Sequence, residues 1–147
     1  MRDRHNENIL IDEEGHCIHI DFGYCLTMAP LYIRLEYTPF KFTQEYLDLL
    51  GGFESPMFYY FKTLLIKAFE IFNKYSDEFW DLVSLMKDAE LPCFQGFDLD
   101  VFKSRFHRFY SDSERDKLVS GLIEESLYSK TFSLYESFQK FSNGIAY

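Results

Sequence analysis

Residues 3–8 of the chain read DRHNEN, and residues 19–23 read HIDFG. Between these motifs, residues 9–12 (ILID) and 16–21 (HCIHID) are short runs rich in apolar and β-branched side chains. The runs are separated by Glu13-Glu14-Gly15, a composition typical of a tight hairpin turn. The stretch therefore predicts a two-stranded ribbon with a polar motif at each end.

The predicted ribbon brings Asn8 and Asp21 together. If Glu14 and Gly15 are the centre of a two-residue turn, antiparallel register pairs Asn8 with Asp21 at the far end of the hairpin. Directly opposed residues lie about 5 Å apart, so an amide oxygen and a carboxylate could bind one hard cation. Mg²⁺ prefers oxygen ligands and is usually held by one or two protein groups together with substrate phosphates. We therefore expect Asn8 and Asp21 to hold Mg²⁺.

Asp3 precedes Asn8 with the D-x-x-x-x-N spacing of a protein-kinase catalytic loop. An Asp in that position accepts the proton of an attacking hydroxyl, while the metal neutralises charge on the transferred phosphoryl group. Protein kinases carry H-R-D in this loop, whereas the order here is Asp3-Arg4-His5. The spacing indicates phosphoryl transfer, and the inverted order indicates a different kinase class.

The two linked motifs, D-R-H-x-x-N and then H-I-D-F-G, resemble the phosphatidylinositol 3- and 4-kinase superfamily. Residues 39–46 and 51–52 look like the segment that closes the activation loop in type III phosphatidylinositol 4-kinases. Residues 91–94, 105–107 and 142–145 are similar to the C-terminal helices of the beta form. The resemblance covers essentially the whole chain. It implies an α+β fold: a kinase-like C-terminal lobe, mostly α-helical, with a small β-hairpin at the catalytic site.

The resemblance also implies an activity and roles for named residues. The activity is ATP-dependent phosphorylation of phosphatidylinositol at the 4-hydroxyl. Asp3 and His5 would handle the hydroxyl proton as catalytic residues. Asn8 and Asp21 would bind the metal and, through it, the phosphates of ATP, so the expected cofactors are ATP and Mg²⁺.

Residues 24–42 form the activation loop in this interpretation and would present the inositol headgroup. Before Pro39 its only charged residues are Arg34 and Glu36, which cancel, and Lys41 lies just beyond. A loop without a Lys or Arg cluster suits phosphatidylinositol better than a bisphosphorylated lipid. Arg34 and Lys41 are the candidate substrate-binding residues.

Two residues of the first motif have roles that the sequence leaves open. Arg4 either holds the catalytic loop by a salt bridge or reaches a phosphate. Glu7 stands where the family usually has a small residue, and it adds a carboxylate near the expected metal.

Three segments follow from these assignments: a catalytic loop and metal-binding hairpin (1–23), the activation loop (24–42) and a helical body (43–147). Capping and stop signals predict six helices in the body. The first helix ends at Gly51-Gly52, the second is capped by Ser55 and runs to about Tyr75, and the third is capped by Ser76 and ends near Lys87. Asp98 caps the fourth, over residues 99–107. A capping box at Ser111–Glu114 opens the fifth, and the last runs from about Lys130 to Asn143.

Composition limits the location and partners of the protein. The formal charge of −9 argues against nucleic-acid binding, which needs clustered Lys and Arg. The chain has three cysteines, an odd number, and they form no CxxC pair. This pattern indicates free thiols in a reducing compartment. No signal peptide and no apolar run of membrane-spanning length are present. We expect a cytoplasmic protein, peripheral on intracellular membranes that include the Golgi, with phosphatidylinositol and regulatory proteins as partners.

The chain contains no Gly-rich phosphate loop and no lysine of the V-A-I-K type. We therefore expect the N-terminal kinase lobe to be absent from it and the chain alone to be inactive. Two alternatives stay open: a phosphatidylinositol 3-kinase or related protein kinase of the same superfamily, and a noncatalytic fragment that acts as a binding module.

Overall fold

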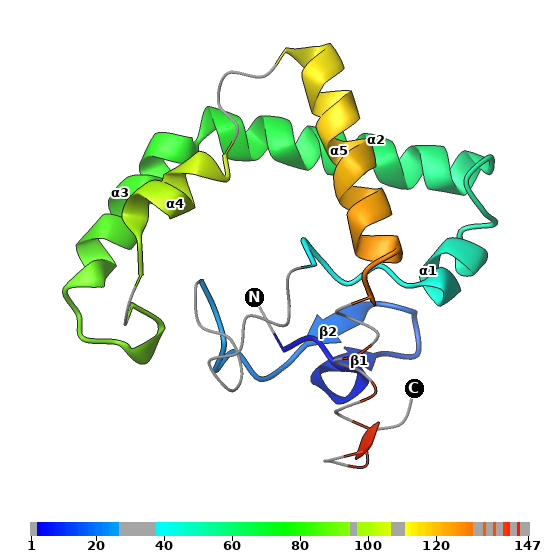
Figure 1. Ribbon diagram of the computed structural model, residues 1–147, viewed down its shortest axis with the longest axis horizontal. Coiled ribbons are helices and arrows are strands. Elements are labelled where there is room, and N and C mark those ends of the chain that lie inside the picture. Colours follow the sequence, from blue (N-terminus) through cyan, green and yellow to red (C-terminus); the bar gives the residue numbers. More distant parts are fainter. Residues whose placement is uncertain are drawn as a thin grey trace. The chain divides into compact units, whose positions relative to one another are not determined.

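The computed structural model describes residues 3–26, 38–94, 97–106 and 111–130, together with Leu134, Ser137, Lys140, Phe141 and Gly144. Within these residues it contains helices and one two-stranded antiparallel sheet, which agrees with the predicted α+β class (Figure 1). The chain divides into two compact units. The first comprises residues 1–38, 90–97 and 129–147, and the second comprises residues 39–89 and 98–128.

The first unit carries the predicted hairpin. A short 3-10 helix η1 (Asn6–Asn8) leads directly into strand β1 (Ile9–Ile11), which pairs with β2 (Cys17–His19). Asp12 organises the turn: its Oδ1 accepts hydrogen bonds from the N–H groups of Glu14 at 3.0 Å and His16 at 2.8 Å. Gly15 has a φ of +87°, the left-handed conformation that glycine adopts without steric cost.

The predicted register of the hairpin is wrong by one residue. Ile9 pairs with His19 and Ile11 with Cys17, so Asn8 lies opposite Ile20 and not opposite Asp21. The N–H of Ile20 donates to the carbonyl of Asn8 at 3.2 Å, which continues the same register. The cause is the turn: a two-residue primed turn would need a positive φ at Glu14, and only Gly15 has one, so residues 13–15 form a three-residue loop.

The second unit is helical, and most of its helices begin where the sequence predicts. They are α1 (Gln44–Leu49), α2 (Pro56–Lys74), α3 (Ser76–Lys87), α4 (Leu99–Ser104) and α5 (Asp112–Leu127). Ser55 caps α2, Asp98 caps α4, and the capping box at Ser111 is formed. The prediction that Ser76 caps a helix is wrong, because α2 ends so close to α3 that Tyr75 is the cap residue and Ser76 is already helical.

One predicted helix end is wrong, and the predicted end of the last helix, Asn143, lies outside the described residues. Helix α4 ends at Ser104, before the predicted end at His107, which lies outside the described residues. Of the last predicted helix, the described positions with helical backbone are Lys130, Leu134, Ser137, Lys140 and Phe141. In the first unit, the predicted break at Leu91-Pro92-Cys93 forms the 3-10 helix η3 (Pro92–Phe94).

The core of the second unit lies where α5 crosses α2 (Figure 1). Its buried residues are Phe42, Leu47, Phe58, Val119 and Ile123. The ring of Phe42 stacks on Phe61 with centroids 5.2 Å apart, and Lys62 forms an ion pair with Asp116 at 2.9 Å between the two helices. Apolar burial of this kind stabilises the unit by roughly 25 cal/mol per Å² removed from water.

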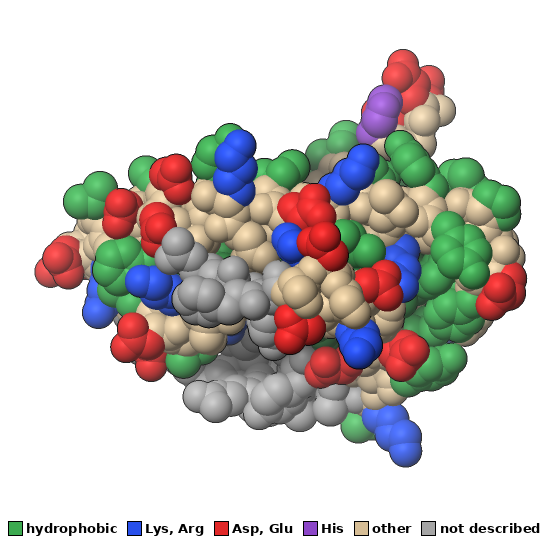
Figure 2. Space-filling view, turned by 90° about the horizontal axis from the view of Figure 1, so that it is seen from above, with side chains coloured by type: hydrophobic (Ala, Val, Ile, Leu, Met, Phe, Trp, Pro, Cys, Tyr) green, Lys and Arg blue, Asp and Glu red, His purple; other side chains and the backbone are tan. Residues whose placement is uncertain are grey.

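The second unit also leaves apolar side chains exposed. They include Tyr59, Tyr60, Leu82 and Leu85. Figure 2 shows hydrophobic side chains among acidic and basic ones on the face of the molecule in view. Among the helices that the structure describes, none combines the length and hydropathy needed to cross a membrane.

Candidate active site

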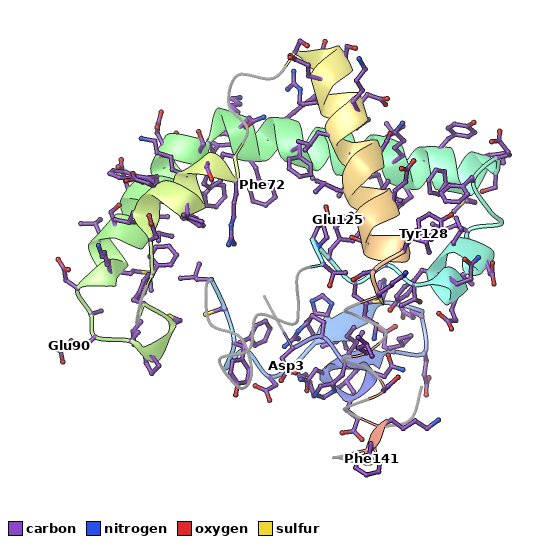
Figure 3. The ribbon with its side chains drawn as sticks, viewed as in Figure 1. Asp3, Phe72, Glu90, Glu125, Tyr128 and Phe141 are labelled. Atoms are coloured by element: carbon purple, nitrogen blue, oxygen red, sulfur yellow. The ribbon has the colours of Figure 1, made fainter. Side chains whose placement is uncertain are left out.

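The buried side chains of residues 3–23 are all polar: Asp3, Arg4 and Asn8, each less than a tenth exposed. Figure 3 shows Asp3 among the side chains beside the β1–β2 hairpin. Polar groups are buried at this density only when hydrogen bonds satisfy them. The loop is therefore a polar network and not a packing element.

Asn8 holds the loop together through its side-chain amide. Its Nδ2 donates to the carbonyl of Asp3 at 2.9 Å and lies 3.2 Å from Nε2 of His5. The Oδ1 atom of Asp3 lies 3.9 Å from the same imidazole nitrogen. Three of the four predicted catalytic and metal-binding residues thus lie together.

The contact with Asn8 sets the tautomer of a neutral His5. An amide Nδ2 can only donate, so Nε2 of His5 accepts, and a neutral imidazole then carries its proton on Nδ1. That Nδ1 atom is buried and has no hydrogen-bond partner within the described part of the chain. A buried donor without a partner is a position that a bound substrate can satisfy.

The fourth predicted residue, Asp21, is exposed just beyond the end of β2. Its Oδ1 accepts a hydrogen bond from the N–H of Gly23 at 3.1 Å, so the D-F-G segment forms a local turn. Asp21 has a φ of +53° and Asp3 a φ of +61°. Left-handed backbone costs a non-glycine residue about 1–2 kcal/mol, and such conformations cluster at functional sites. Both candidate carboxylates are therefore held in an unusual backbone conformation.

Arg4 connects the catalytic loop to the segment that carries Asp21. Its Nη1 donates to the carbonyl of Ile20 at 2.8 Å and to that of Asn8 at 3.3 Å, and its Nη2 donates to the carbonyl of Asp21. Of the two roles left open by the sequence, this arrangement matches the one in which Arg4 holds the loop. The sequence contains no signal for these contacts, because main-chain carbonyls are present at every position.

The side-chain oxygens of Asn8 and Asp21 are ligand atoms suited to a hard divalent cation. Asn8 uses Nδ2 for its contacts with Asp3 and His5, which leaves the amide Oδ1 as its possible ligand atom. Asp21 is an exposed carboxylate whose main chain binds the same guanidinium as that of Asn8. The described ranges contain no group of three or more His, Cys, Asp or Glu side chains suited to a metal. A site with two protein oxygens matches Mg²⁺, which is completed by waters and phosphates.

The remaining candidates lie elsewhere or outside the described residues. Arg34 belongs to residues 27–37, which the structure does not describe. Lys41 is half-buried in the second unit, just before α1. A hydrogen bond with the Thr43 side chain is the main cause of the lowered pKa of Glu45, and the charge of Lys41 adds a smaller contribution. Glu7 is exposed within η1.

Among the described residues of the first unit, Asp12 and Cys25 have shifted pKa values. The N–H of His16, and then its imidazole, lower the pKa of Asp12 in the turn. Burial, and then a hydrogen bond with Cys93, raise the pKa of the Cys25 thiol. Cys25 is therefore a protonated packing residue and not a reactive thiolate.

Comparison with known proteins matches the whole chain. A sequence model of the family described as "Phosphatidylinositol 3- and 4-kinase" matches residues 1–96. Proteins named "Phosphatidylinositol 4-kinase beta" from Homo sapiens, Bos taurus and Rattus norvegicus are each 39% identical to this chain over an alignment of 147 residues. The alignment covers 99% of this chain. The chain spans 18% of the length of these relatives.

Proposed function

The chain belongs to the phosphatidylinositol 3- and 4-kinase family, and from this membership we propose that it supplies the phosphoryl-transfer loops of an ATP-dependent kinase acting on the 4-hydroxyl of phosphatidylinositol. The observation that carries the proposal is the buried cluster of Asp3, His5 and Asn8, formed by the motif that the family shares. The 4-hydroxyl rests on the printed name of the relatives, phosphatidylinositol 4-kinase beta.

Asp3 is the proton acceptor in this proposal. Its carboxylate lies beside His5, whose Nε2 is already an acceptor for Asn8. The attacking hydroxyl would lose its proton to Asp3, while the buried Nδ1–H of His5 would donate to an oxygen of the substrate. The hydrogen bond from Asn8 to the carbonyl of Asp3 holds the loop in this conformation.

Asn8 Oδ1 and the Asp21 carboxylate are the groups that would hold Mg²⁺ on the phosphates of ATP. The cation would supply charge neutralisation on the transferred phosphoryl group, which is the main catalytic requirement of this reaction. The exposure of Asp21 allows a nucleotide to approach it. Since the chain spans 18% of its relatives, the other contacts to ATP would come from the rest of the kinase.

The substrate would be phosphatidylinositol without further phosphates. In the sequence of the activation loop Arg34 and Glu36 cancel, so nothing there balances the added charge of a 4,5-bisphosphate. We place Arg34 and Lys41 as headgroup contacts. Because the substrate lies in a bilayer, the enzyme would work at the cytoplasmic surface of intracellular membranes, the Golgi among them.

The test is a lipid-kinase assay with the full-length protein that contains this chain. Vesicles carrying phosphatidylinositol, its 4-phosphate or its 4,5-bisphosphate at matched surface density receive Mg²⁺ and ATP, and headgroup chromatography identifies the product. We expect phosphatidylinositol to be preferred and the product to be the 4-phosphate. A 3-phosphate product would assign the protein to the 3-kinases, and the absence of any phosphorylated lipid would contradict the proposal.

A further inference from the structure

Building on the proposed function, we propose that Arg4 is a positioning residue of the phosphoryl-transfer site. Its guanidinium fixes the main chain of Asn8 relative to that of Asp21, so that both side chains reach one divalent cation. The contacts that support this are the three hydrogen bonds from Arg4 to the carbonyls of Asn8, Ile20 and Asp21.

The hairpin does not provide this link by itself. The paired strands end at Ile9 and His19, and one further hydrogen bond joins Ile20 to Asn8. Asp21 is beyond this point, and its φ of +53° turns the chain out of the strand conformation. Arg4 supplies a contact that ties the main chain of Asp21 to the catalytic loop.

The chemistry of arginine suits this role. A guanidinium is planar and presents several N–H donors in a rigid fork, so one side chain can bind carbonyls from two segments at fixed separation. Its Cζ also lies 6.0 Å from the centroid of the Phe22 ring, so it contacts three successive residues of the second motif. A lysine would keep the charge but offers a single flexible ammonium.

The burial of Arg4 argues against a direct role in binding a substrate phosphate. Arg4 is 6% exposed, and its Nη1 and Nη2 already donate to protein carbonyls. A residue that reached a substrate phosphate would have to break these bonds. Arg4 thus acts on the reaction through Asn8 and Asp21.

The first test measures metal binding without turnover. In the full-length kinase, Arg4→Lys and Arg4→Gln are compared with the wild type and with Arg105→Gln, an exposed arginine of the second unit. Electron paramagnetic resonance follows Mn²⁺ binding in the presence of a non-hydrolysable ATP analogue. We expect Mn²⁺ affinity to fall about 10- to 100-fold in both Arg4 variants, as when groups that orient metal ligands are removed. The Arg105 variant should bind as the wild type does.

A second measurement reports on the main chain in metal-free protein. Amide hydrogen exchange of residues 20–23 should become faster in both Arg4 variants and stay unchanged in the control.

A third measurement uses the active enzyme with Mg²⁺. Steady-state rates of both Arg4 variants should show a raised half-saturating Mg²⁺ concentration. A residue that only supported folding would lower the amount of active enzyme and leave that concentration unchanged.

The outcomes separate this proposal from the proposed function. Wild-type Mn²⁺ affinity in Arg4→Lys would overturn the role of Arg4, because charge without the fork would then be sufficient. Failure of both variants to fold would overturn it as well, since Arg4 would be required by the whole unit. A wild-type kinase that phosphorylates no inositol lipid, with Mn²⁺ binding still lost in the variants, would contradict only the proposed function.

Discussion

The catalytic loop with its hairpin and the helical unit bury opposite kinds of side chain. In residues 3–23 the buried side chains are Asp3, Arg4 and Asn8, and specific hydrogen bonds connect them. In the helical unit the central cluster is apolar and includes Val119 and Ile123 at 0% and 1% exposure. A change at an exposed polar residue of the first region, such as Asp21, should therefore alter chemistry with little loss of stability. A truncation in the apolar core of the second should do the reverse.

The largest effect should come from Asp21→Asn in the full-length kinase. A neutral amide loses the charge that binds Mg²⁺, so we expect turnover to fall to less than about a tenth of the wild-type rate. Folding should be nearly intact because Asp21 is exposed and an amide oxygen can still accept from Gly23. Glu13→Gln, which removes a carboxylate from the exposed turn, is the matched control. A variant that keeps more than about a tenth of the rate would remove Asp21 from the metal site.

Truncation of the apolar core should act on stability alone. Ile123→Ala should lower the free energy of unfolding by about 2–5 kcal/mol, because it removes buried methyl groups and leaves a cavity. Leu85→Ala, at a position 80% exposed, should change it by less than about 0.5 kcal/mol. Denaturant unfolding measures both variants. A shift in the Mg²⁺ requirement of the folded Ile123 variant would break the distinction between the two regions.

Replacing Gly15 and replacing Gly121 by alanine should change the free energy of unfolding in opposite directions. An added Cβ meets nothing within 4 Å at either Gly15 or Gly121, so only backbone conformation decides the outcome. Gly15→Ala should destabilise the protein by about 1–2 kcal/mol because of its left-handed φ of +87°. Gly121→Ala, inside α5, should stabilise it by about 0.5–1 kcal/mol. Equal effects in denaturant unfolding would show that the turn does not need a left-handed residue.

The smallest effect should be a pH dependence of the hairpin turn. Hydrogen bonds from His16 lower the folded-state pKa of Asp12 below its ordinary value of 3.8. The stabilisation is therefore present above that value and is lost as pH falls through the lower folded-state pKa. The protection of the turn amides, measured as exchange relative to the intrinsic rate at each pH, should fall in that acidic window, and Asp12→Asn should abolish the dependence. Protection that stays constant through this window in the wild type would contradict the assignment.

The helix starts could be predicted because their signals act within a few residues. The hydroxyl of Ser55 accepts from the N–H of Phe58 at 3.0 Å, and the Ser111–Glu114 capping box closes over the same span. Ser76 failed as a cap for a reason that sequence spacing does not show. Helix α2 continues to Lys74, which leaves only Tyr75 between two helices.

The site was harder to predict than the helices. Turns of two and three residues share the composition Glu13-Glu14-Gly15, and the conformation of Glu14, which has no positive φ here, decides between them. The contacts of Arg4 could not be predicted, because their acceptors are main-chain oxygens. The motif nevertheless identified Asp3, His5 and Asn8, which the structure brings together. The roles of Arg34 and Lys41 stay predictions.

Manganese anomalous scattering tests the metal ligands most directly, with crystals of the full-length kinase bound to a non-hydrolysable ATP analogue. We predict a peak about 2.0–2.2 Å from Asn8 Oδ1 and from the Asp21 carboxylate, near the distance expected for such an octahedral cation. Arg4 should still donate to the carbonyls of both residues. A peak bound by Glu7, with Asn8 or Asp21 out of contact, would contradict the assignment of the metal ligands and the positioning role of Arg4 with it.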